Sequence, residues 1–466
     1  MAVEQCVAEG LAALTANRAT HIPGRLNRLL AALTPRSVAT RSGGTAIARR
    51  FGQGSRMLRH VDVGKLSLAR YRSLIDPALL EEVPALARPL RHARVLHLNA
   101  TPYGGGVAEL LRSEVALLRG LGIEADWKVI SGDERFFHVT KEFHNALQGA
   151  RYHLTERARE TYLAANALSA HQLEQEYDFV FVHDPQPAAL RALRKNGQGK
   201  WIWRCHIDTS QPNEEVWAFL KPYVQAHDAA IFTMRGFVPP DLEVAETAII
   251  PPAIDALSPK NMPLPLGKCR EILGWIGVDT ARPLVTQISR FDAWKDPHGV
   301  IEAHKLARRE VPGLQLALVG SMALDDPEGW QVYSEIVEHQ RGDPDSYVFT
   351  NATGVGNVEV NAFQRIARVV VQKSIREGFG LVVSEALWKG TPVVAGRAGG
   401  IPLQLTDGRS GYLVESVEEC AERIVRLLEH PQKAEAMGAA GRAHVAAHFL
   451  MPRLIRDELR LLARLA

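Results

Sequence analysis

The sequence predicts an α/β protein with two Rossmann-like, doubly wound domains facing a central cleft. Apolar strand candidates alternate with amphipathic helix candidates in two successive series, as in parallel sheets covered by helices. A proline-rich stretch without periodicity, 251–265, separates the two series. At 466 residues the chain is also too long for one ordinary core.

Each series supplies one domain. In the first, residues 66–90 are expected to be helical, and an apolar run at 94–99 precedes three glycines and a helix, which is how a doubly wound domain begins. Its strand candidates are 94–99, 126–130, 179–183, 201–206 and 229–233, and its helix candidates are 107–121, 156–177 and 214–226. The second series has strand candidates at 284–288, 314–319, 347–350, 369–372 and 392–395, and helix candidates at 298–309, 331–340, 358–366, 382–388 and 417–428.

These elements predict a basic N-terminal arm at 1–60, an acceptor domain at 61–260 and a donor domain at 261–449. A final helix within 450–466 is expected to cross back onto the first domain. The arm carries nine Arg and two Glu, whereas the net charge of the whole chain is only +3, which argues against a nucleic-acid binder. The arm's role is open, with homodimer formation as one candidate.

Composition also indicates the cellular compartment in which the protein is expected. The four cysteines lie far apart with no CxxC pair, as expected of a reduced, cytoplasmic protein. The sequence contains no run of about 18 apolar residues, so no membrane span is expected. Glu4 and Glu9 precede the first apolar stretch, which is the wrong order for a secretory signal and counts against an organelle transit peptide.

The most informative segment is 373–390, where a glycine-rich turn lies between two carboxylates, Glu377 and Glu385. The glycines let the backbone approach a ligand closely, and the helix that follows presents unpaired N–H groups, which favour an anion. A surface loop with a helical Glu is the plainer alternative. The predicted donor-binding residues here are Glu377, Gly378, Phe379, Gly380, Leu381, Val382 and Glu385.

Two cations follow the strand candidate 284–288. Arg290 and Lys295 lie in one loop at the strand end, where both can converge on a diphosphate. Fixed cations would stabilise the negative charge that grows on a leaving diphosphate. Alone, the pair could equally be solvated. No Asp-x-Asp metal clamp is present, so the expected site needs neither a metal nor a cofactor, although Mg²⁺ is compatible with it.

Three groups in the first domain follow strands, where a doubly wound sheet presents its functional residues. Gly105 and Gly106 follow the strand that ends at Asn99, but their spacing is not that of a dinucleotide site, and a simple tight turn is the alternative. Asp184 could orient an acceptor hydroxyl. His206 could bind the donor sugar or accept a proton, although a histidine at a strand end is often structural.

These residues, in this order, resemble the retaining nucleotide-sugar glycosyltransferases of family 4, which have the GT-B fold. Arg290-x4-Lys295 and Glu377-x7-Glu385 carry that resemblance, over about 61–450. A narrower resemblance is to trehalose synthases of the glycosyltransferring type. It rests on the strings that begin at Asn99, Trp127, Gly132, Thr140, His144, His183, Trp203 and Gly399. The basic arm is a departure from the family's core.

The resemblance implies reversible, retaining transfer of glucose from ADP- or UDP-glucose to glucose, which gives α,α-trehalose. By this analogy Glu377 binds donor hydroxyls, Glu385 binds the ribose, and Arg290 and Lys295 hold the diphosphate. The implied acceptor-side residues are Asn99, Gly105, Gly106, Asp184 and His206, and the implied catalytic residues are Glu377, His206, Asp184, Arg290 and Lys295.

Three alternatives remain open from the sequence. One is a trehalose phosphorylase, in which free phosphate would occupy the position of the diphosphate. Another is a family 4 glycosyltransferase with a different sugar acceptor. The third is a non-catalytic protein that senses sugars or nucleotides. The base preference is not readable, because the candidate base pocket, 347–358, would act mainly through its backbone.

Overall fold

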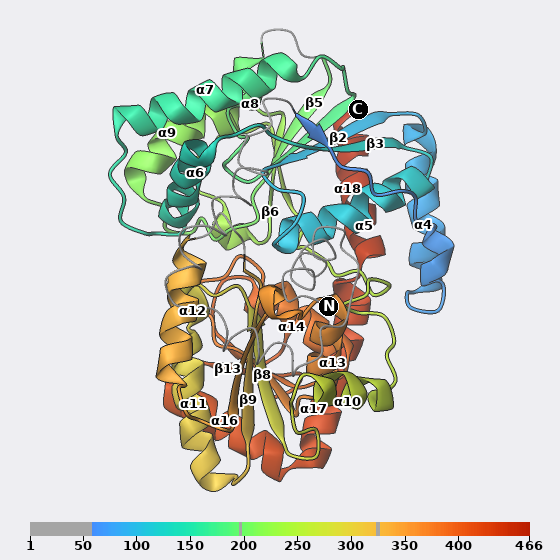
Figure 1. The fold of residues 1–466 in the computed structure, drawn as a ribbon. Helices are drawn as coiled ribbons and strands as arrows, with labels where there is room; N and C mark the ends of the chain where they lie inside the picture. The colour runs from blue at the N-terminus through green and yellow to red at the C-terminus, as the bar shows by residue number, and fades with distance from the viewer. Residues whose placement is uncertain (1–57, 195–197, 323–326) are drawn as a thin grey trace, which may run out of the picture.

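Two parallel sheets organise the chain, one in each of two α/β domains placed end to end (Figure 1). The computed structural model describes residues 58–194, 198–322 and 327–466. The first 57 residues of the predicted arm lie outside the described residues. The predicted fold class, two doubly wound Rossmann-like domains, is confirmed.

Within the described residues, the N-terminal sheet has seven strands. In their spatial order they are β1 (Arg59–His60), β3 (Glu124–Val129), β2 (Arg94–Asn99), β4 (Phe179–His183), β5 (Lys200–Arg204), β6 (Ala229–Phe232) and β7 (Glu246–Ile249). All pairs are parallel except β1 with β3. The helices are α4 (Pro77–Ala87), α5 (Gly106–Gly120), α6 (Glu134–Leu147), α7 (Glu156–Gln172), α8 (Leu190–Leu193) and α9 (Glu214–Gln225). One core joins the sheet to α4 and α5, and the other joins its opposite face to α6, α7 and α9.

The C-terminal sheet has six parallel strands. In spatial order they are β10 (Ser346–Thr350), β9 (Gln315–Gly320), β8 (Leu284–Ser289), β11 (Val369–Gln372), β12 (Val393–Gly396) and β13 (Tyr412–Val414). On one face lie α11 (Pro297–Glu310), α12 (Pro327–His339) and α16 (Val417–Glu429). On the other lie α10 (Leu266–Trp275), α13 (Asn357–Ile366), α14 (Leu381–Trp388), α15 (Ile401–Gln404) and α17 (Pro431–His448).

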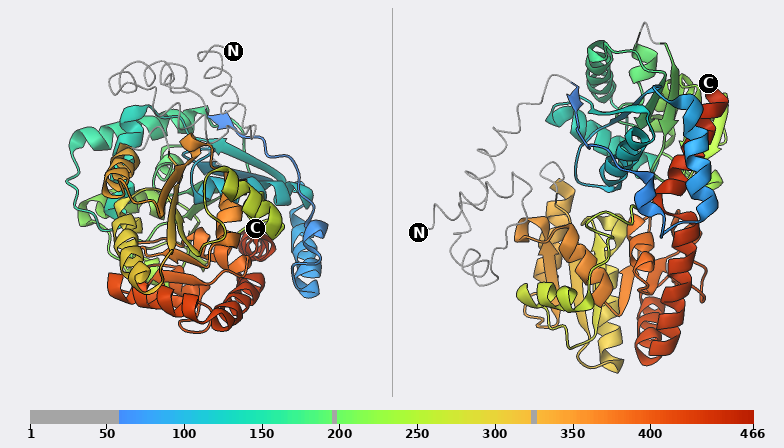
Figure 2. Two further views of the ribbon diagram at one scale, coloured as in Figure 1. Left: turned by 60° about the horizontal axis from the view of Figure 1, so that its bottom comes forward. Right: turned by 90° about the vertical axis from the view of Figure 1, so that its right-hand side faces the viewer.

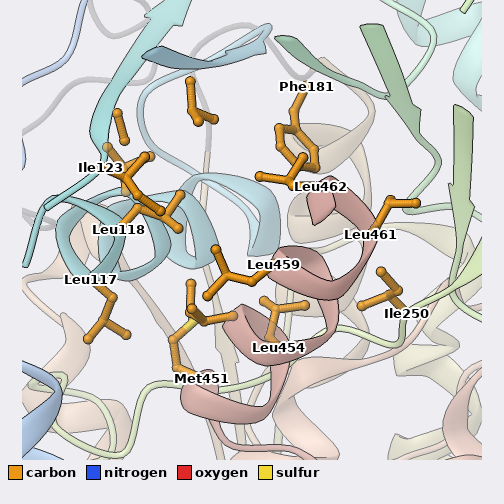
Figure 3. Close-up of a cluster of buried hydrophobic side chains, with 14 of the residues drawn as sticks. Leu117, Leu118, Ile123, Phe181, Ile250, Met451, Leu454, Leu459, Leu461 and Leu462 are labelled. Atoms are coloured by element: carbon orange, nitrogen blue, oxygen red, sulfur yellow. The ribbon is translucent and has the colours of Figure 1, made fainter. Parts of the chain in front are cut away.

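The last helix, α18 (Met451–Leu465), follows α17 and returns to the N-terminal domain (Figures 1 and 2). It packs on α4 and α5, and its apolar side chains enter the same core as Ile250 and Phe181 (Figure 3). The α18 residues in this core are Met451, Leu454, Ile455, Leu459, Leu461 and Leu462. The chain therefore closes one face of its first sheet with its final segment.

The expected helix over 66–90 is wrong as a single element. A 3-10 turn at Leu68–Tyr71 ends before Asp76, whose carboxylate accepts a hydrogen bond from Ala78 N at 2.8 Å and begins α4. Pro77 occupies the first helical position, where its missing N–H is not needed. Strand β5 also ends at Arg204, so His206 lies in the following loop and not in the strand. In the part of the chain that the structure describes, no helix is long and apolar enough to cross a membrane.

Candidate active site at the domain junction

The strand order of the C-terminal sheet reverses between β8 and β11, and ligands bind at such points in doubly wound folds. The loop after β8 carries Lys295, and the loop after β11 carries Glu377. The two side chains meet, with Lys295 Nζ 2.8 Å from Glu377 Oε2. Both are largely buried, at 14% and 10% exposed. The structure thus brings together a cation and a carboxylate that lie 82 positions apart.

Further hydrogen bonds hold this pair in place. Glu377 Oε2 also accepts from Ser374 Oγ at 3.1 Å and from Gln372 Nε2 at 3.4 Å. Gln287 Nε2 donates to the Lys295 carbonyl at 2.7 Å. Because several donors converge on one carboxylate, its position is fixed before any ligand arrives. Sequence reasoning missed Ser374 and Gln372, although both belong to the end of the predicted strand at 369–372 or the turn after it.

Arg290 does not join the Lys295–Glu377 pair. Its guanidinium lies 3.4 Å from Asp292 Oδ2, and its side chain is 40% exposed. Asp292 in turn accepts a hydrogen bond from Lys295 N at 3.2 Å. The two predicted phosphate ligands therefore share one loop, with Lys295 inside the junction and Arg290 at its edge.

Helix α14 begins at this site without a side-chain cap. Its N-cap, Gly380, has φ 78°, which residues other than glycine rarely adopt. Two of the predicted donor-binding residues, Leu381 and Val382, are half-buried in the first turn of the helix. Phe379 instead lies in the hydrophobic core, 5.4 Å from the ring of Phe449. In the first turn of α14, Val383 N donates to Gly380 O and Ser384 N donates to Gln404 Oε1. The expectation of unpaired N–H groups therefore holds, among the described residues, for Leu381 and Val382, whose N–H groups can bind an anion.

The second carboxylate, Glu385, is 2% exposed and sits beside Lys260, 3.6 Å away. Lys260 also donates to Glu109 of α5 at 2.6 Å. Burial alone would lower the pKa of Lys260, but Glu109 and Glu385 outweigh it and raise that pKa. Gln364 Nε2 completes the set at 3.3 Å from Glu385. Lys260 was missed because it lies in the proline-rich linker.

The N-terminal domain meets this site with its glycine turn. Gly104 and Gly105 have φ values of 77° and 132°, so the turn depends on glycine. A Cβ on Gly106 would lie 3.0 Å from Leu381 Cδ1, which places the uncapped start of α5 against the start of α14. Asn99 is buried, donates to Thr101 O at 2.6 Å and accepts from Trp127 Nε1 at 2.8 Å. Its amide therefore holds the turn.

Asp184 and His206 are also close together. Asp184 has φ 65°, and its Oδ1 accepts a hydrogen bond from His206 N at 2.8 Å. Burial raises the pKa of Asp184 to about 7. Burial lowers the pKa of His206 well below its usual range, so its ring is neutral at pH 7. The low pKa makes His206 a weak base.

The two domains contact each other through a close backbone approach and an ion pair. A Cβ on Gly378 would lie 2.0 Å from the carbonyl oxygen of His206, so only glycine fits there. Arg376 lies 3.4 Å from Asp208 across the junction. His144 of α6 is half-buried near the cations of the other domain. Burial lowers its pKa to about 3, with smaller contributions from Arg290 and Lys295.

Comparison with known proteins identifies the family and the fold. The N-terminal domain of trehalose synthases matches residues 97–239, and glycosyl transferases group 1 match residues 274–444. Sucrose-phosphate synthase from Thermosynechococcus elongatus superimposes with a TM-score of 0.64 at 19% identity, over 80% of this chain and 99% of that one. The trehalose-6-phosphate synthase OtsA superimposes with a TM-score of 0.62 at 14% identity, over 80% of this chain and 100% of that one. The fold and the family matches together define a two-domain glycosyltransferase with the GT-B fold.

Sequence relatives narrow the class. The trehalose synthase of Rubrobacter xylanophilus is 53% identical over 414 residues, which is 88% of this chain and 99% of that protein. The trehalose synthase of Pyrococcus horikoshii is 45% identical over 390 residues, which is 83% of this chain and 94% of that protein. The trehalose phosphorylase of Pleurotus pulmonarius is 30% identical over 399 residues, but only 54% of that protein is covered. The chain belongs to the trehalose synthase family.

Proposed function

We propose that the protein is a retaining hexosyltransferase that moves glucose reversibly from a nucleoside diphosphate glucose to glucose, forming α,α-trehalose. The observation that carries this proposal is the 2.8 Å contact of Lys295 with Glu377 below the uncapped start of α14, directly against the His206 loop. This arrangement offers a carboxylate for sugar hydroxyls and a cation with free N–H groups for a diphosphate. Family membership supports trehalose as the product.

In the proposed reaction the acceptor hydroxyl oxygen bonds to the anomeric carbon on the face from which the diphosphate leaves. The bond from that carbon to the phosphate oxygen breaks, and the phosphate oxygen takes the hydroxyl proton. Lys295, Arg290 and the start of α14 stabilise the negative charge on the leaving group. Glu377 orients the donor sugar, and Glu385 binds the ribose. Positioning supplies the rest of the rate enhancement.

The decisive experiment incubates the protein with glucose and each of a panel of nucleoside diphosphate glucoses. The disaccharide formed is then identified by NMR, including the configuration at both anomeric carbons. The proposal expects α,α-trehalose with release of the nucleoside diphosphate. It also expects trehalose and a nucleoside diphosphate to regenerate the sugar nucleotide. A product of β configuration would contradict retention.

The same assay separates the alternatives. A trehalose phosphorylase would break trehalose only with inorganic phosphate and would give glucose 1-phosphate. A glycosyltransferase with another acceptor would consume the donor only with a different sugar. A sensing protein would bind sugar nucleotide in calorimetry without turnover. Each of these outcomes would replace the proposed reaction.

A further inference from the structure

A row of three histidine rings runs from the candidate active site into the N-terminal core. His206 Nε2 lies 2.9 Å from His183 Nδ1, and His183 Nε2 lies 3.1 Å from His97 Nδ1. The rings are stacked, with centroids 5.2 and 5.4 Å apart. His97 and His183 belong to the adjacent strands β2 and β4 and are at most 1% exposed. Of these three histidines, only His206 is among the residues predicted for the site.

The inner end of the row reaches a buried charge cluster. His97 Nδ1 lies 3.3 Å from Glu114 Oε1 of α5, and neither side chain is exposed to solvent. Next to Glu114 is Glu458 of α18, which forms an ion pair with Arg204 at the end of β5. Together these groups connect the core under α18 with His206.

The contacts decide where the protons lie. Glu458 has a cation partner, whereas Glu114 makes no ion pair with a Lys or Arg among the described residues. Burial and the neighbouring Glu458 raise the pKa of Glu114 well above its usual range. Glu114 is therefore the protonated member of the two carboxyls, with its hydroxyl toward Glu458 and Oε1 left as an acceptor.

His97 then carries its proton on Nδ1. This nitrogen lies 3.1 Å from His183 Nε2 and 3.3 Å from Glu114 Oε1. Among the described residues, His97 Nε2 and Glu114 Oε1 are both buried without a hydrogen-bond partner, so a proton on Nδ1 is the one that Glu114 Oε1 could accept. A buried lone pair without a partner is less costly than a buried N–H without one. With Nδ1–H on His97, His183 must accept at Nε2 and donate from Nδ1. His206 must then accept at Nε2.

We propose that Glu114, His97 and His183 are positioning residues that fix His206 in the tautomer with its proton on Nδ1. Nδ1 is the ring nitrogen that makes no hydrogen bond within the described part of the chain, so in this tautomer it is available to donate to a ligand. His206 thus donates to a substrate oxygen and does not remove the acceptor's proton. The donor role rests on the proposed glycosyl transfer, whereas the tautomer does not.

The tautomer is measurable by NMR on the full chain with ¹⁵N-labelled histidine. The His206 signals are identified by their loss in His206→Asn. The expected spectrum at pH 7.5 shows a protonated Nδ1 and an unprotonated Nε2 for His206. Glu114→Gln keeps this pattern, because the amide presents the same acceptor and donor as a protonated carboxyl. Glu114→Leu, which has neither, gives a mixture of tautomers.

Activity gives a second readout. Glu114→Leu and His97→Phe are expected to lower kcat/KM about tenfold, the loss of one well-placed hydrogen bond in the transition state. Glu114→Gln should restore at least a third of the wild-type value, and thermal unfolding of all variants checks the fold. A protonated Nε2 on His206, or an unchanged tautomer in Glu114→Leu, would overturn the proposal. If the wild-type chain transfers no glucose, the NMR result still decides the tautomer by itself.

Discussion

Lys295 makes the sharpest single-residue prediction. Lys295→Ala removes the buried cation that would face the leaving diphosphate, so kcat/KM should fall by about 10²–10³-fold. The matched control is Lys268→Ala, because Lys268 pairs with Glu271 on the exposed surface of α10 and is 63% exposed. Initial rates of nucleoside diphosphate release measure both. Near-wild-type turnover in both Lys295→Ala and Glu377→Ala would rule out the proposed site.

Asp184 gives a prediction with pH. Its pKa is about 7 in the folded protein and near 3.8 when unfolded, so the folded state binds more protons between these values. The contribution of Asp184 to stability therefore decreases as pH rises from about 4 to 7 and then stays level. Asp184→Asn keeps the acceptor for His206 N and tolerates the φ of 65°, since Asn is common there.

Asp184→Asn should thus raise Tm most at pH 8 and least near pH 4. The gain at pH 8 should be roughly 1–2 kcal/mol, because partial exposure reduces the full effect of the shift. Thermal unfolding of both proteins across that pH range checks it. A Tm difference that does not change with pH would show that Asp184 is not protonated in the folded state.

Gly378 tests the contact between domains. A Cβ at Gly378 would lie 2.0 Å from His206 O, so Gly378→Ala must push the two loops apart. A shift of about 1 Å can lower a rate by on the order of 10²-fold, so kcat/KM should fall by about that factor while the protein stays folded. Gly267→Ala is the control, because nothing lies within 4 Å of a Cβ there. Equal activity of the two variants would contradict the close approach.

At the scale of elements, α18 stabilises the N-terminal domain through its apolar face. Leu459 is fully buried against α4 and α5, so Leu459→Ala should lower the free energy of unfolding by about 2–5 kcal/mol. Arg464→Ala removes an exposed ion pair with Glu246 and an exposed hydrogen bond to Arg460 O, and should cost less than about 1 kcal/mol. Urea denaturation of both variants makes the comparison. A small effect of Leu459→Ala would mean that α18 is not essential to that core.

The sequence predicted buried strands better than several helices. Apolar runs such as 94–99 and 179–183 match β2 and β4, because both faces of a central parallel strand are covered. Helix α17 was missed because it is rich in Ala and Gly and has no clear apolar stripe. Its Gly438 packs so closely that a Cβ would lie 1.9 Å from Gly390 O. Strand β7 was missed because it is a polar edge strand.

The residues of the candidate site were likewise predictable from the sequence only in part. Lys295, Glu377 and His206 were predictable because each follows a buried strand, and strand ends meet at one edge of a sheet. Lys260 and His144 were not predicted as site residues, since Lys260 lies in the linker and α6, which carries His144, was not among the predicted helices. Glu114 reads in the sequence as an ordinary charged helix residue. Only the return of α18, which brings Glu458 beside it, explains its burial.

At the scale of the whole molecule, Lys260 joins the two domains. It contacts Glu109 of α5 and Glu385 of α14, and Glu385 is almost fully buried. Lys260→Met should cost about 3–5 kcal/mol, because it leaves Glu385 as a buried charge that has lost its partner. The double variant Lys260→Met, Glu385→Gln should recover much of that loss, since the amide needs no counter-charge.

Urea denaturation of the wild type, both single variants and the double variant completes this cycle. Lys268→Met serves as the control for loss of a lysine, because its ion pair is exposed. The expected loss of stability is large for Lys260→Met alone and small for the double variant, so the coupling energy between the two positions should be large. If Lys260→Met were as stable as Lys268→Met, Glu385 would not depend on Lys260. The contact of α5 with α14 would then rest on packing, as at Gly106 and Leu381.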